Sequence, residues 1–329
     1  MKAGEKAMKK IVDDLRLVYK CCDLYYTDQM TQQEICDSLG LSRATVSRML
    51  RIGREQGIVR IEVINPINFD YGKLEKDLER KYGLKEVIVV DNQPLDTEED
   101  RIQRLSEASF DYLSHLFRDG DSIGVAMGYT LYNVANVKKQ YEYDKQFLFV
   151  PLFGGISQTR MGKIDVQANQ IAASFAQKFG GRYVQFLAPA VFSNEEVMKG
   201  FLQEKSVNYI YDYFDKLDSV VMGIGIPERG GSTMVSAGYI DGEKMDEFVE
   251  MGAVGDIALR YFNKEGNTEP FKEFNDKVAS IPTETLKKVE NRIGIGGGVE
   301  KVNAIKGAIR AQFINILITD VDCAERMLQ

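Results

Sequence analysis

The feature that most restricts the fold of this chain is an alternation, between residues 86 and 328, of short apolar runs with longer amphipathic segments. The short runs are rich in Val and Ile, which is typical of strands buried on both faces. We predict strands at 86–90, 121–127, 146–152, 182–188, 217–225, 292–295 and 315–319. We predict helices at 98–118, 128–139, 165–179, 243–250, 299–311 and 321–328. This order predicts a mostly parallel α/β sheet covered by helices on both faces.

The first 60 residues follow a different pattern, which predicts an all-helical module. Leu15, Val18, Cys22 and Tyr25 recur at the spacing of one face of an amphipathic helix. Because no strand pattern interrupts this region before residue 58, we expect it to form a domain separate from the α/β body.

Two further helices are predicted from capping signals between residues 31 and 57. Thr31 with Glu34 has the spacing of a capping box, and Gly40 is the expected end of that helix. Ser42 is the expected cap of the next helix, which runs to about Gln56. The alternating segment IVRIEVINP (58–66) then predicts a short strand or wing.

This arrangement is typical of a helix-turn-helix, in which a small residue and a turn glycine let two helices cross closely. Cys36 is the small residue here. The N-terminal part of the second helix enters the major groove in such motifs, where arginine matches guanine and a methyl group meets thymine. We expect the DNA-contacting residues to be Gln32, Gln33, Ser42, Arg43, Ala44, Thr45, Ser47, Arg48 and Arg51. The alternative is a plain helical hairpin with a charged outer face.

The charge distribution supports the first interpretation. The whole chain has a net charge of −7, but residues 1–60 hold 11 basic and 8 acidic residues, which gives +3. The remainder holds 31 basic and 41 acidic residues, which gives −10. A basic module attached to an acidic body is therefore expected.

Cysteine and histidine content predicts no metal site and no cofactor. The cysteines are Cys21, Cys22, Cys36 and Cys323, and the single histidine is His115, so the ligand spacing of a zinc site is missing. We expect Cys21 and Cys22 to pack as small apolar groups. The sequence has neither a signal-peptide pattern nor an apolar run long enough for a membrane span, which predicts a cytoplasmic protein without a membrane partner.

Glycine-rich loops after the predicted strands indicate a site for a phosphate group. Exposed backbone N–H groups at the start of a helix bind phosphate, and a nearby ammonium neutralises it. Ligands of open α/β sheets bind beyond the carboxyl ends of the strands, where these loops are expected to lie. We expect the residues that bind this ligand to be Gly128, Tyr129, Thr130, Leu131, Gly154, Gly155, Ser157, Gln158, Asp256, Gly297, Gly298 and Lys301. The alternative is that these glycines only make tight turns.

The chain resembles the SorC-type sugar-responsive bacterial regulators over most of its length. The segment 31–63 is similar to their winged N-terminal domain. Further segments match in the same order: GVAMGYTL (124–131), PLFGGIS (151–157), MGIG (222–225), GAVGDIALRYFNKEG (252–266) and IGIGGGVEKVNAIKGAIRAQFINILITD (293–320).

The resemblance implies a Rossmann-like body similar to ribose-phosphate isomerases and CoA transferases, used to bind an effector instead of catalysing a reaction. It also implies a homotetramer, operator DNA as a partner and a phosphorylated sugar as the effector. We expect a winged helix-turn-helix domain over 1–64 and an effector-binding and oligomerisation domain over 65–329, with a linker helix at 65–83. Ala126, Met127 and Pro227 depart from the family pattern, which leaves the identity of the ligand open.

Two other functions are compatible with the same residues. A sugar-phosphate isomerase would share the fold but needs a positioned base, for which Asp256 is the only candidate, and it has no use for the N-terminal module. A regulator of another ligand, such as a nucleotide, an unphosphorylated sugar or a phosphorylated signalling molecule, differs only in the effector. A dinucleotide fingerprint at GIGGG does not fit, because the G-x-G-x-x-G register is absent.

Overall fold

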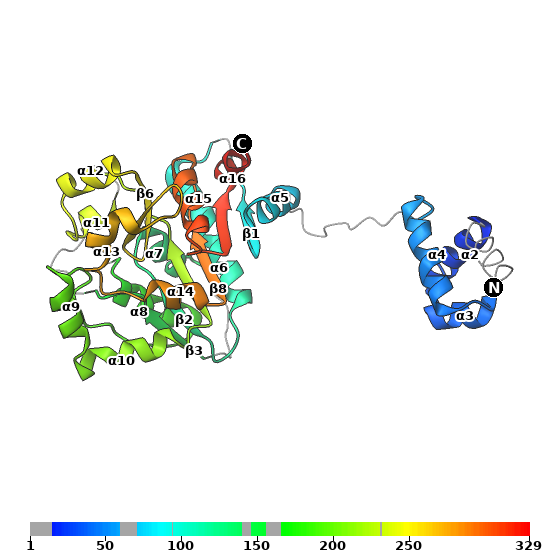
Figure 1. Ribbon diagram of the computed structural model, residues 1–329, viewed down its shortest axis with the longest axis horizontal. Helices are drawn as coiled ribbons and strands as arrows, with labels where there is room; N and C mark the ends of the chain where they lie inside the picture. The colour runs from blue at the N-terminus through cyan, green and yellow to red at the C-terminus, as the bar shows by residue number, and fades with distance from the viewer. Residues whose placement is uncertain (1–14, 60–70, 94, 140–145, 156–165, 231) are drawn as a thin grey trace. The chain divides into compact units, whose positions relative to one another are not determined.

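The computed structural model describes residues 15–59, 71–93, 95–139, 146–155, 166–230 and 232–329. The chain divides into two compact units, within Met1–Phe69 and Asp70–Gln329 (Figure 1). Each unit is described separately. The domain boundary expected after residue 64, the wing beyond residue 59 and the start of the linker helix lie outside the described residues.

In the first unit, residues 15–59 are described, and they form three helices, α2 (Leu15–Tyr26), α3 (Gln32–Leu39) and α4 (Arg43–Glu55). Its buried residues come from all three helices: Val18, Cys21, Cys22, Ile35, Cys36, Val46, Met49 and Leu50. The stripe predicted on α2 is only partly buried, because Leu15 in the first turn is 54% exposed. The predicted all-helical character of this region is confirmed.

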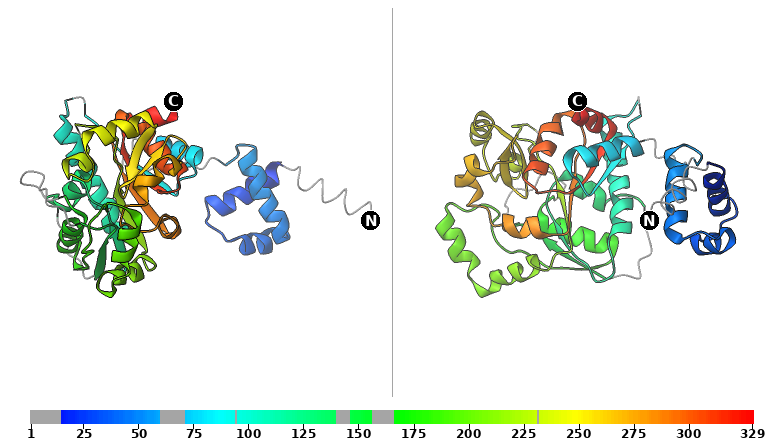
Figure 2. Two further views of the ribbon diagram at one scale, coloured as in Figure 1. Left: turned by 60° about the vertical axis from the view of Figure 1, so that its left-hand side comes forward. Right: turned by 45° about the vertical axis from the view of Figure 1, so that its right-hand side comes forward.

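The second unit is built on a seven-stranded sheet with the order β1-β9-β8-β5-β2-β3-β4, and every pairing in it is parallel. The strands are β1 (Glu86–Val90), β2 (Ser122–Val125), β3 (Phe147–Pro151), β4 (Gly181–Tyr183), β5 (Ser219–Gly223), β8 (Asn291–Ile295) and β9 (Ile316–Asp320). Helices lie on both faces of the sheet (Figures 1 and 2). The predicted parallel α/β body is confirmed.

The helices of this unit begin with α5 (Gly72–Tyr82), which precedes β1. They continue with α6 (Glu98–Leu116), α7 (Tyr129–Ala135), α8 (Ala168–Phe179), α9 (Glu195–Leu202), α10 (Lys205–Phe214), α11 (Thr233–Ser236), α12 (Gly242–Glu250), α13 (Lys272–Asn275), α14 (Thr283–Lys288), α15 (Val302–Arg310) and α16 (Val321–Leu328). Two short 3₁₀ helices are η1 (Glu269–Phe271) and η2 (Val299–Lys301). Within the described ranges, no helix has both the length and the apolar character that a membrane crossing needs.

The strand predicted at 182–188 is wrong beyond Tyr183. β4 is an edge strand of three residues that pairs only with β3. The backbone of Phe186 bonds to the side chain of Asn169 in α8 instead, with Phe186 N donating at 2.8 Å and the Asn169 amide donating to Phe186 O at 3.1 Å. A side-chain amide therefore replaces the missing strand neighbour and draws the chain out of the sheet.

A second correction concerns the region around Asp256. It lies in β6 (Ala253–Ile257), which pairs with β7 (Arg260–Asn263) in an antiparallel hairpin outside the main sheet. The turn of this hairpin holds Ala258 and Leu259 at positive φ, 48° and 67°. The prediction had placed Asp256 in a loop beyond a strand of the parallel sheet.

Candidate functional site

The turn between α3 and α4 is formed by the predicted caps. Thr31 N donates to the Glu34 carboxylate at 2.8 Å, and Glu34 N donates to the Thr31 hydroxyl at 3.3 Å, so the capping box is confirmed. Gly40 ends α3 with a φ of 64°, a left-handed conformation that favours glycine. Ser42 caps α4 by accepting a hydrogen bond of 3.2 Å from Thr45 N. Two short helices thus cross at a tight, locally encoded turn.

Close packing against α2 holds α4 in position. A Cβ atom on Gly53 would lie 2.3 Å from Cys22 Sγ, so α4 approaches α2 to a distance that only glycine permits. The Cys21 thiol donates to Met49 Sδ at 3.5 Å. Burial raises the pKa of Cys21 to about 11 and also raises that of Cys22, which makes both thiols unreactive core groups.

The outer face of α4 exposes most of the residues predicted to contact DNA. Arg43, Ala44, Ser47, Arg48 and Arg51 are exposed. Arg43 and Arg48 have no ion-pair partner within the described part of the chain. α4 therefore presents two arginines of its N-terminal half to solvent.

Other members of this predicted set have partners within the unit. The hydroxyls of Ser42 and Thr45 are hydrogen-bonded to each other at 2.8 Å. Arg51 lies 3.8 Å from the carboxylate of Glu55, and the Gln33 amide donates to Asp37 at 3.1 Å. Gln32 is half-buried at the start of α3. These side chains would have to exchange partners to contact DNA.

A cavity of about 760 Å³ opens over the carboxyl ends of β9, β8, β5 and β2, four neighbouring strands in the centre of the sheet. Its lining includes Ala126, Met127, Gly128, Tyr129 and Thr130 after β2, Gly223, Ile224 and Gly225 at the end of β5, Gly297, Gly298, Val299, Glu300 and Lys301 after β8, and Asp320 and Asp322 after β9. Segments far apart in the sequence thus meet at one end of the sheet, as is usual for ligand sites of open α/β folds.

The loop after β8 lies against the end of β9. Gly298 N donates to Asp320 Oδ2 at 2.5 Å, and a Cβ atom on Gly297 would lie 2.2 Å from the same oxygen. The other oxygen of Asp320 accepts from Cys323 N at 2.8 Å and so caps α16. One carboxylate therefore holds the glycine loop and the start of α16 together.

Lys301 reaches the cavity from the end of η2. Burial lowers the pKa of its ammonium, and the carboxylates of Glu300, Asp256 and Asp320 partly offset this effect. The Lys301 ammonium makes neither a hydrogen bond nor an ion pair within the described residues, whereas its backbone N–H donates to Gly298 O at 3.1 Å. It is therefore a buried cation whose surrounding carboxylates act on it at longer range.

Asp256 approaches the cavity from the β6–β7 hairpin. Its backbone forms two hydrogen bonds with Gly225, of 3.1 and 3.2 Å, and a Cβ atom on Gly225 would lie 2.1 Å from Asp256 Oδ1. Burial raises the pKa of its carboxyl to about 6, while the Lys301 ammonium and a hydrogen bond from the Leu259 backbone lower it. Asp256 and Lys301 thus influence each other's charge within one cavity.

Several predicted effector residues lie elsewhere. Leu131 is fully buried in the core of the α/β body. Gly154 lies against the Ala188 and Pro189 carbonyls, and neither it nor Gly155 belongs to the cavity lining. Ser157 and Gln158 lie outside the described residues. The sequence places these residues at the ends of strands, but it does not indicate whether a residue there packs into the core or lines the cavity.

The prediction also missed lining residues that lie outside the glycine loops it selected. Glu98, Arg101, Ile102 and Leu105 come from the start of α6, and Glu228, Ser232 and Thr233 follow β5. The one available signal was the cap at the start of α6, where Thr97 and Asp100 form a capping box. The cap locates the start of α6, but only the fold brings that start to the cavity.

The cavity lining is rich in carboxyl groups. The lining residues that the structure describes include six carboxyls, Glu98, Glu228, Asp256, Glu300, Asp320 and Asp322, and two cations, Arg101 and Lys301. Such a lining can accept hydrogen bonds from many hydroxyl groups and has one buried ammonium for an anionic group. No group of three or more histidine, cysteine or carboxylate side chains within the described ranges is arranged to hold a metal ion.

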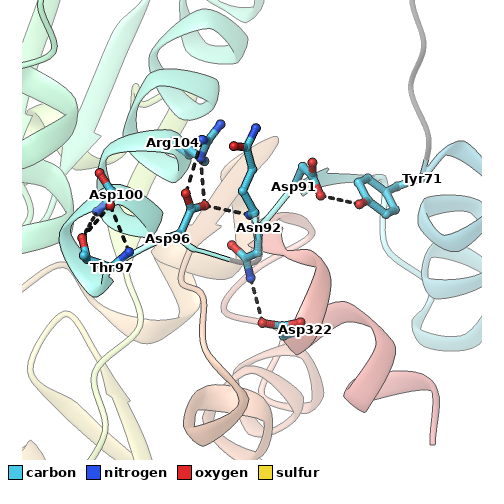
Figure 3. A network of polar contacts seen from close by, with 9 residues as sticks. Tyr71, Asp91, Asn92, Asp96, Thr97, Asp100, Arg104 and Asp322 are labelled. Carbon is cyan, nitrogen blue, oxygen red and sulfur yellow. Dashed lines mark hydrogen bonds and ion pairs between the residues drawn. The ribbon is translucent and has the colours of Figure 1, made fainter.

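A polar network connects the cavity wall to the start of α5 (Figure 3). The Asn92 amide donates to Asp322 at 2.9 Å, and Asp91, the preceding residue, accepts from the Tyr71 hydroxyl at 2.5 Å. Asp96 accepts from Arg104 Nε at 2.9 Å, which fixes the segment after Asn92 to α6. Tyr71 is the first described residue after the segment 60–70, which joins the two units in sequence.

Comparison with known proteins gives a consistent result for both units. Residues 68–329 match the family model "Putative sugar-binding domain", and residues 15–69 match the model "Crp-like helix-turn-helix domain". The sorbitol operon regulator of Klebsiella pneumoniae is 32% identical over 96% of this chain and 99% of that protein. The deoxyribonucleoside regulator of Bacillus subtilis is 31% identical over 95% of this chain and 97% of that protein.

Solved structures agree with these matches. The crystal structure of the full-length sorbitol operon regulator SorC from Klebsiella pneumoniae has a TM-score of 0.70 at 31% identity and covers 96% of this chain and 99% of that chain. A transcriptional regulator from Streptococcus pneumoniae TIGR4 has a TM-score of 0.70 at 26% identity, over 79% of this chain and 98% of that one.

Proposed function

Because the chain belongs to the SorC family of sugar-binding transcriptional regulators, we propose that it controls a sugar-catabolism operon in response to a phosphorylated sugar. The helix-turn-helix supplies DNA binding and the α/β body supplies the sugar site. The observation that carries the proposal is the Lys301 ammonium, which has no carboxylate of the described residues within ion-pair distance, in a cavity that carboxyls, glycines and apolar side chains line together.

Lys301 is the proposed phosphate-binding residue. A buried ammonium without a direct carboxylate partner gains more from a bound anion than an exposed one does, because water screens it less. The carboxylates of Asp320 and Glu300 lie against Gly297 and Gly298, so a phosphate that approached the backbone there would take their place. Since Gly298 N donates to Asp320, a phosphate at this loop would have to use other N–H groups or displace that carboxylate.

The carboxyl groups are proposed to bind the sugar hydroxyls. Carboxylates accept hydrogen bonds from hydroxyl donors, and Asp256 and Glu300 line the same cavity as Lys301. Six carboxyls against two cations also favour a second candidate, an unphosphorylated sugar or polyol, which would bring no additional negative charge. The two candidates differ in whether the phosphate contributes to affinity.

At the other end of the chain, Arg43 and Arg48 are the proposed base-reading residues. They are exposed and lie in the N-terminal half of α4, the part of a recognition helix that enters the major groove. Gln32, Gln33, Ser42, Ala44, Thr45, Ser47 and Arg51 complete the proposed DNA-contacting set. A regulator that binds operator DNA acts where the chromosome is, so the cytoplasm is its proposed location.

We propose a two-state mechanism in which the effector binds one arrangement of a homotetramer more tightly and so changes the population that binds DNA. The network from Asp322 through Asn92 and Asp91 to Tyr71 supports a connection between the cavity and the chain leading to the helix-turn-helix. A symmetric assembly would also match an operator with repeated half-sites.

The test is fluorescence anisotropy of the full chain on DNA from upstream of its own gene, titrated with sugar phosphates and their unphosphorylated parents. One phosphate should shift DNA affinity while its parent sugar does not. A response to the parent sugar alone would replace the first candidate with the second. A protein that binds no DNA specifically would overturn the regulator proposal.

Lys301→Ala provides the residue-level test. Loss of a charged hydrogen-bond donor should weaken binding of the phosphorylated effector by about tenfold to a hundredfold. DNA binding without effector should stay unchanged. Lys205→Ala, at an exposed lysine of α10, is the matched control and should leave both affinities unchanged. Equal loss for a phosphate and its parent sugar would exclude a phosphate role for Lys301.

A further inference from the structure

The cavity of about 760 Å³ that holds Lys301 is called the effector cavity below. A second cavity, of about 820 Å³, lies at the opposite end of the sheet. Its walls come from the C-terminal ends of α5 and α15, the start of β8 and the residues that precede β9. The lining residues that the argument uses are Lys81, Arg292, Lys306 and Arg310. None of the residues proposed to bind the effector takes part in it.

The charge of this cavity contrasts with that of the effector cavity. Its described lining contains four cations and neither an aspartate nor a glutamate. None of the four cations forms an ion pair with any carboxylate in the part of the chain that the structure describes. A concave, positively charged surface on a body of net negative charge concentrates anions locally.

Backbone carbonyls hold three of these cations in place without neutralising them, and for Arg310 the acceptor is the Lys264 carbonyl. Lys81 Nζ donates to the carbonyls of Met327 and Leu328 at 3.1 and 2.7 Å. An Arg292 terminal nitrogen donates to the carbonyls of Lys287 and Val289 at 3.0 and 2.6 Å. A carbonyl fixes the direction of a cation but has no net charge, so the positive charge of the cavity remains.

Two observations indicate that an acceptor is missing. Arg292 Nε is a buried donor without a hydrogen-bond partner among the described residues, and buried donors are nearly always paired. The ammonium of Lys306, a residue of α15, makes no hydrogen bond within those residues either. Burial lowers the pKa of its ammonium, and the positive charges of Lys81, Arg310 and Arg326 lower it further. An anion in the cavity would offset this repulsion and could accept from the unpaired donors.

We propose that this cavity is a second ligand site, which binds a small polyanion carrying two or more phosphate or carboxylate groups. The volume lies within the range of about 300–1,000 Å³ that is usual for small-molecule sites. Four cations on three elements, α5, β8 and α15, match several anionic groups on one ligand better than a single one. The inference is independent of the proposed effector site, because the two cavities share no lining residue.

The experiment is isothermal titration calorimetry of the full chain with pyrophosphate and with citrate, at constant ionic strength. We expect saturable binding of at least one probe. Lys306→Gln should weaken it by about tenfold, because one uncompensated charge facing the ligand is lost. Lys205→Gln, at an exposed lysine remote in sequence from this cavity, is the matched control and should bind like the wild type.

Lys301→Ala separates the two sites, since it alters the effector cavity and should leave binding of the probes unchanged. Loss of probe binding in Lys301→Ala, equal binding by Lys306→Gln and wild type, or no saturable binding at all would each overturn the proposal. The melting temperatures of the variants show whether a loss of probe binding reflects misfolding. If Lys306→Gln is destabilised, Arg310→Gln provides the same binding test at a second position. Light scattering measures the oligomer mass of the same variants. If Lys306→Gln changes that mass and the wild type binds no probe, the cavity belongs to a contact between copies of the chain and not to a ligand site.

Discussion

The side-chain amide of Asn92 donates a hydrogen bond of 2.9 Å to the carboxylate of Asp322, which lines the cavity proposed to bind the effector. Asn92 follows β1, and its neighbour Asp91 accepts from Tyr71 at the start of α5 (Figure 3). A change at the cavity wall therefore has a direct polar route to the end of the segment that leads to the helix-turn-helix. Physical coupling along such a route can be tested by removing one of its hydrogen bonds at a time.

Asn92→Leu should reduce the effect of the effector on DNA affinity while leaving both separate affinities close to those of the wild type. Allosteric coupling factors usually lie between about 5 and 150, so a fall towards 1 is measurable. The measurement is DNA anisotropy with and without saturating effector. Gln93→Ala removes an adjacent exposed side chain and is the control. An unchanged coupling factor in Asn92→Leu would exclude this route.

Arg48→Ala should weaken specific operator binding by about 1–3 kcal/mol if the guanidinium reads a base edge. Binding to unrelated DNA should change much less, because base contacts contribute only to specificity. Competition anisotropy with operator and scrambled DNA measures both. Arg54→Ala, at an arginine of the last turn of α4, is the control on the same helix. Equal losses on both DNAs would make Arg48 a phosphate contact.

Asp256 should make the protein less stable as the pH rises from about 4 to 6. Its pKa is raised from 3.8 to about 6 in the folded state, so the folded chain binds the proton more tightly than the unfolded chain does. Stabilisation from this group is complete below 3.8 and is lost as the pH passes 6, a difference of about 3 kcal/mol.

Urea unfolding of wild type and Asp256→Asn between pH 4 and 8 measures this contribution. The free energy of unfolding of the variant should depend less on pH in this interval than that of the wild type. Comparison of the two proteins cancels the titration of all other groups. Identical pH profiles would mean that Asp256 has the same pKa in the folded and the unfolded chain.

Gly53→Ala should destabilise the helix-turn-helix unit by about 1–3 kcal/mol, because the added methyl group would meet Cys22 Sγ at 2.3 Å. Hydrogen exchange should become faster in residues 15–59 and stay unchanged in the α/β body. The control is Gly200→Ala in α9, where a Cβ atom meets nothing within 4 Å and alanine should stabilise the helix by up to about 1 kcal/mol. Unchanged hydrogen exchange in Gly53→Ala would show that α2 and α4 can move apart without loss of stability.

The sequence determined those features that depend on residues close together in the chain. The caps at Thr31 and Ser42 and the αL turn at Gly40 each involve contacts within a few residues, and all three lie where they were predicted. The central strands were also predictable, because burial on both faces leaves continuous Val- and Ile-rich runs.

The tertiary structure decided what depends on partners far away in the sequence. Tyr183 ends β4 because Asn169 takes over the backbone of Phe186, and nothing in 182–188 itself indicates this. Asp256 reaches the effector cavity because its hairpin bonds to Gly225, not because it follows a strand of the main sheet. Arg101 lines that cavity because the packing of α6 brings its first turn there. The periodicity of apolar residues indicates which face of a helix or strand is buried. It does not indicate which other helix or strand packs against that face, because this depends on the packing of the whole chain.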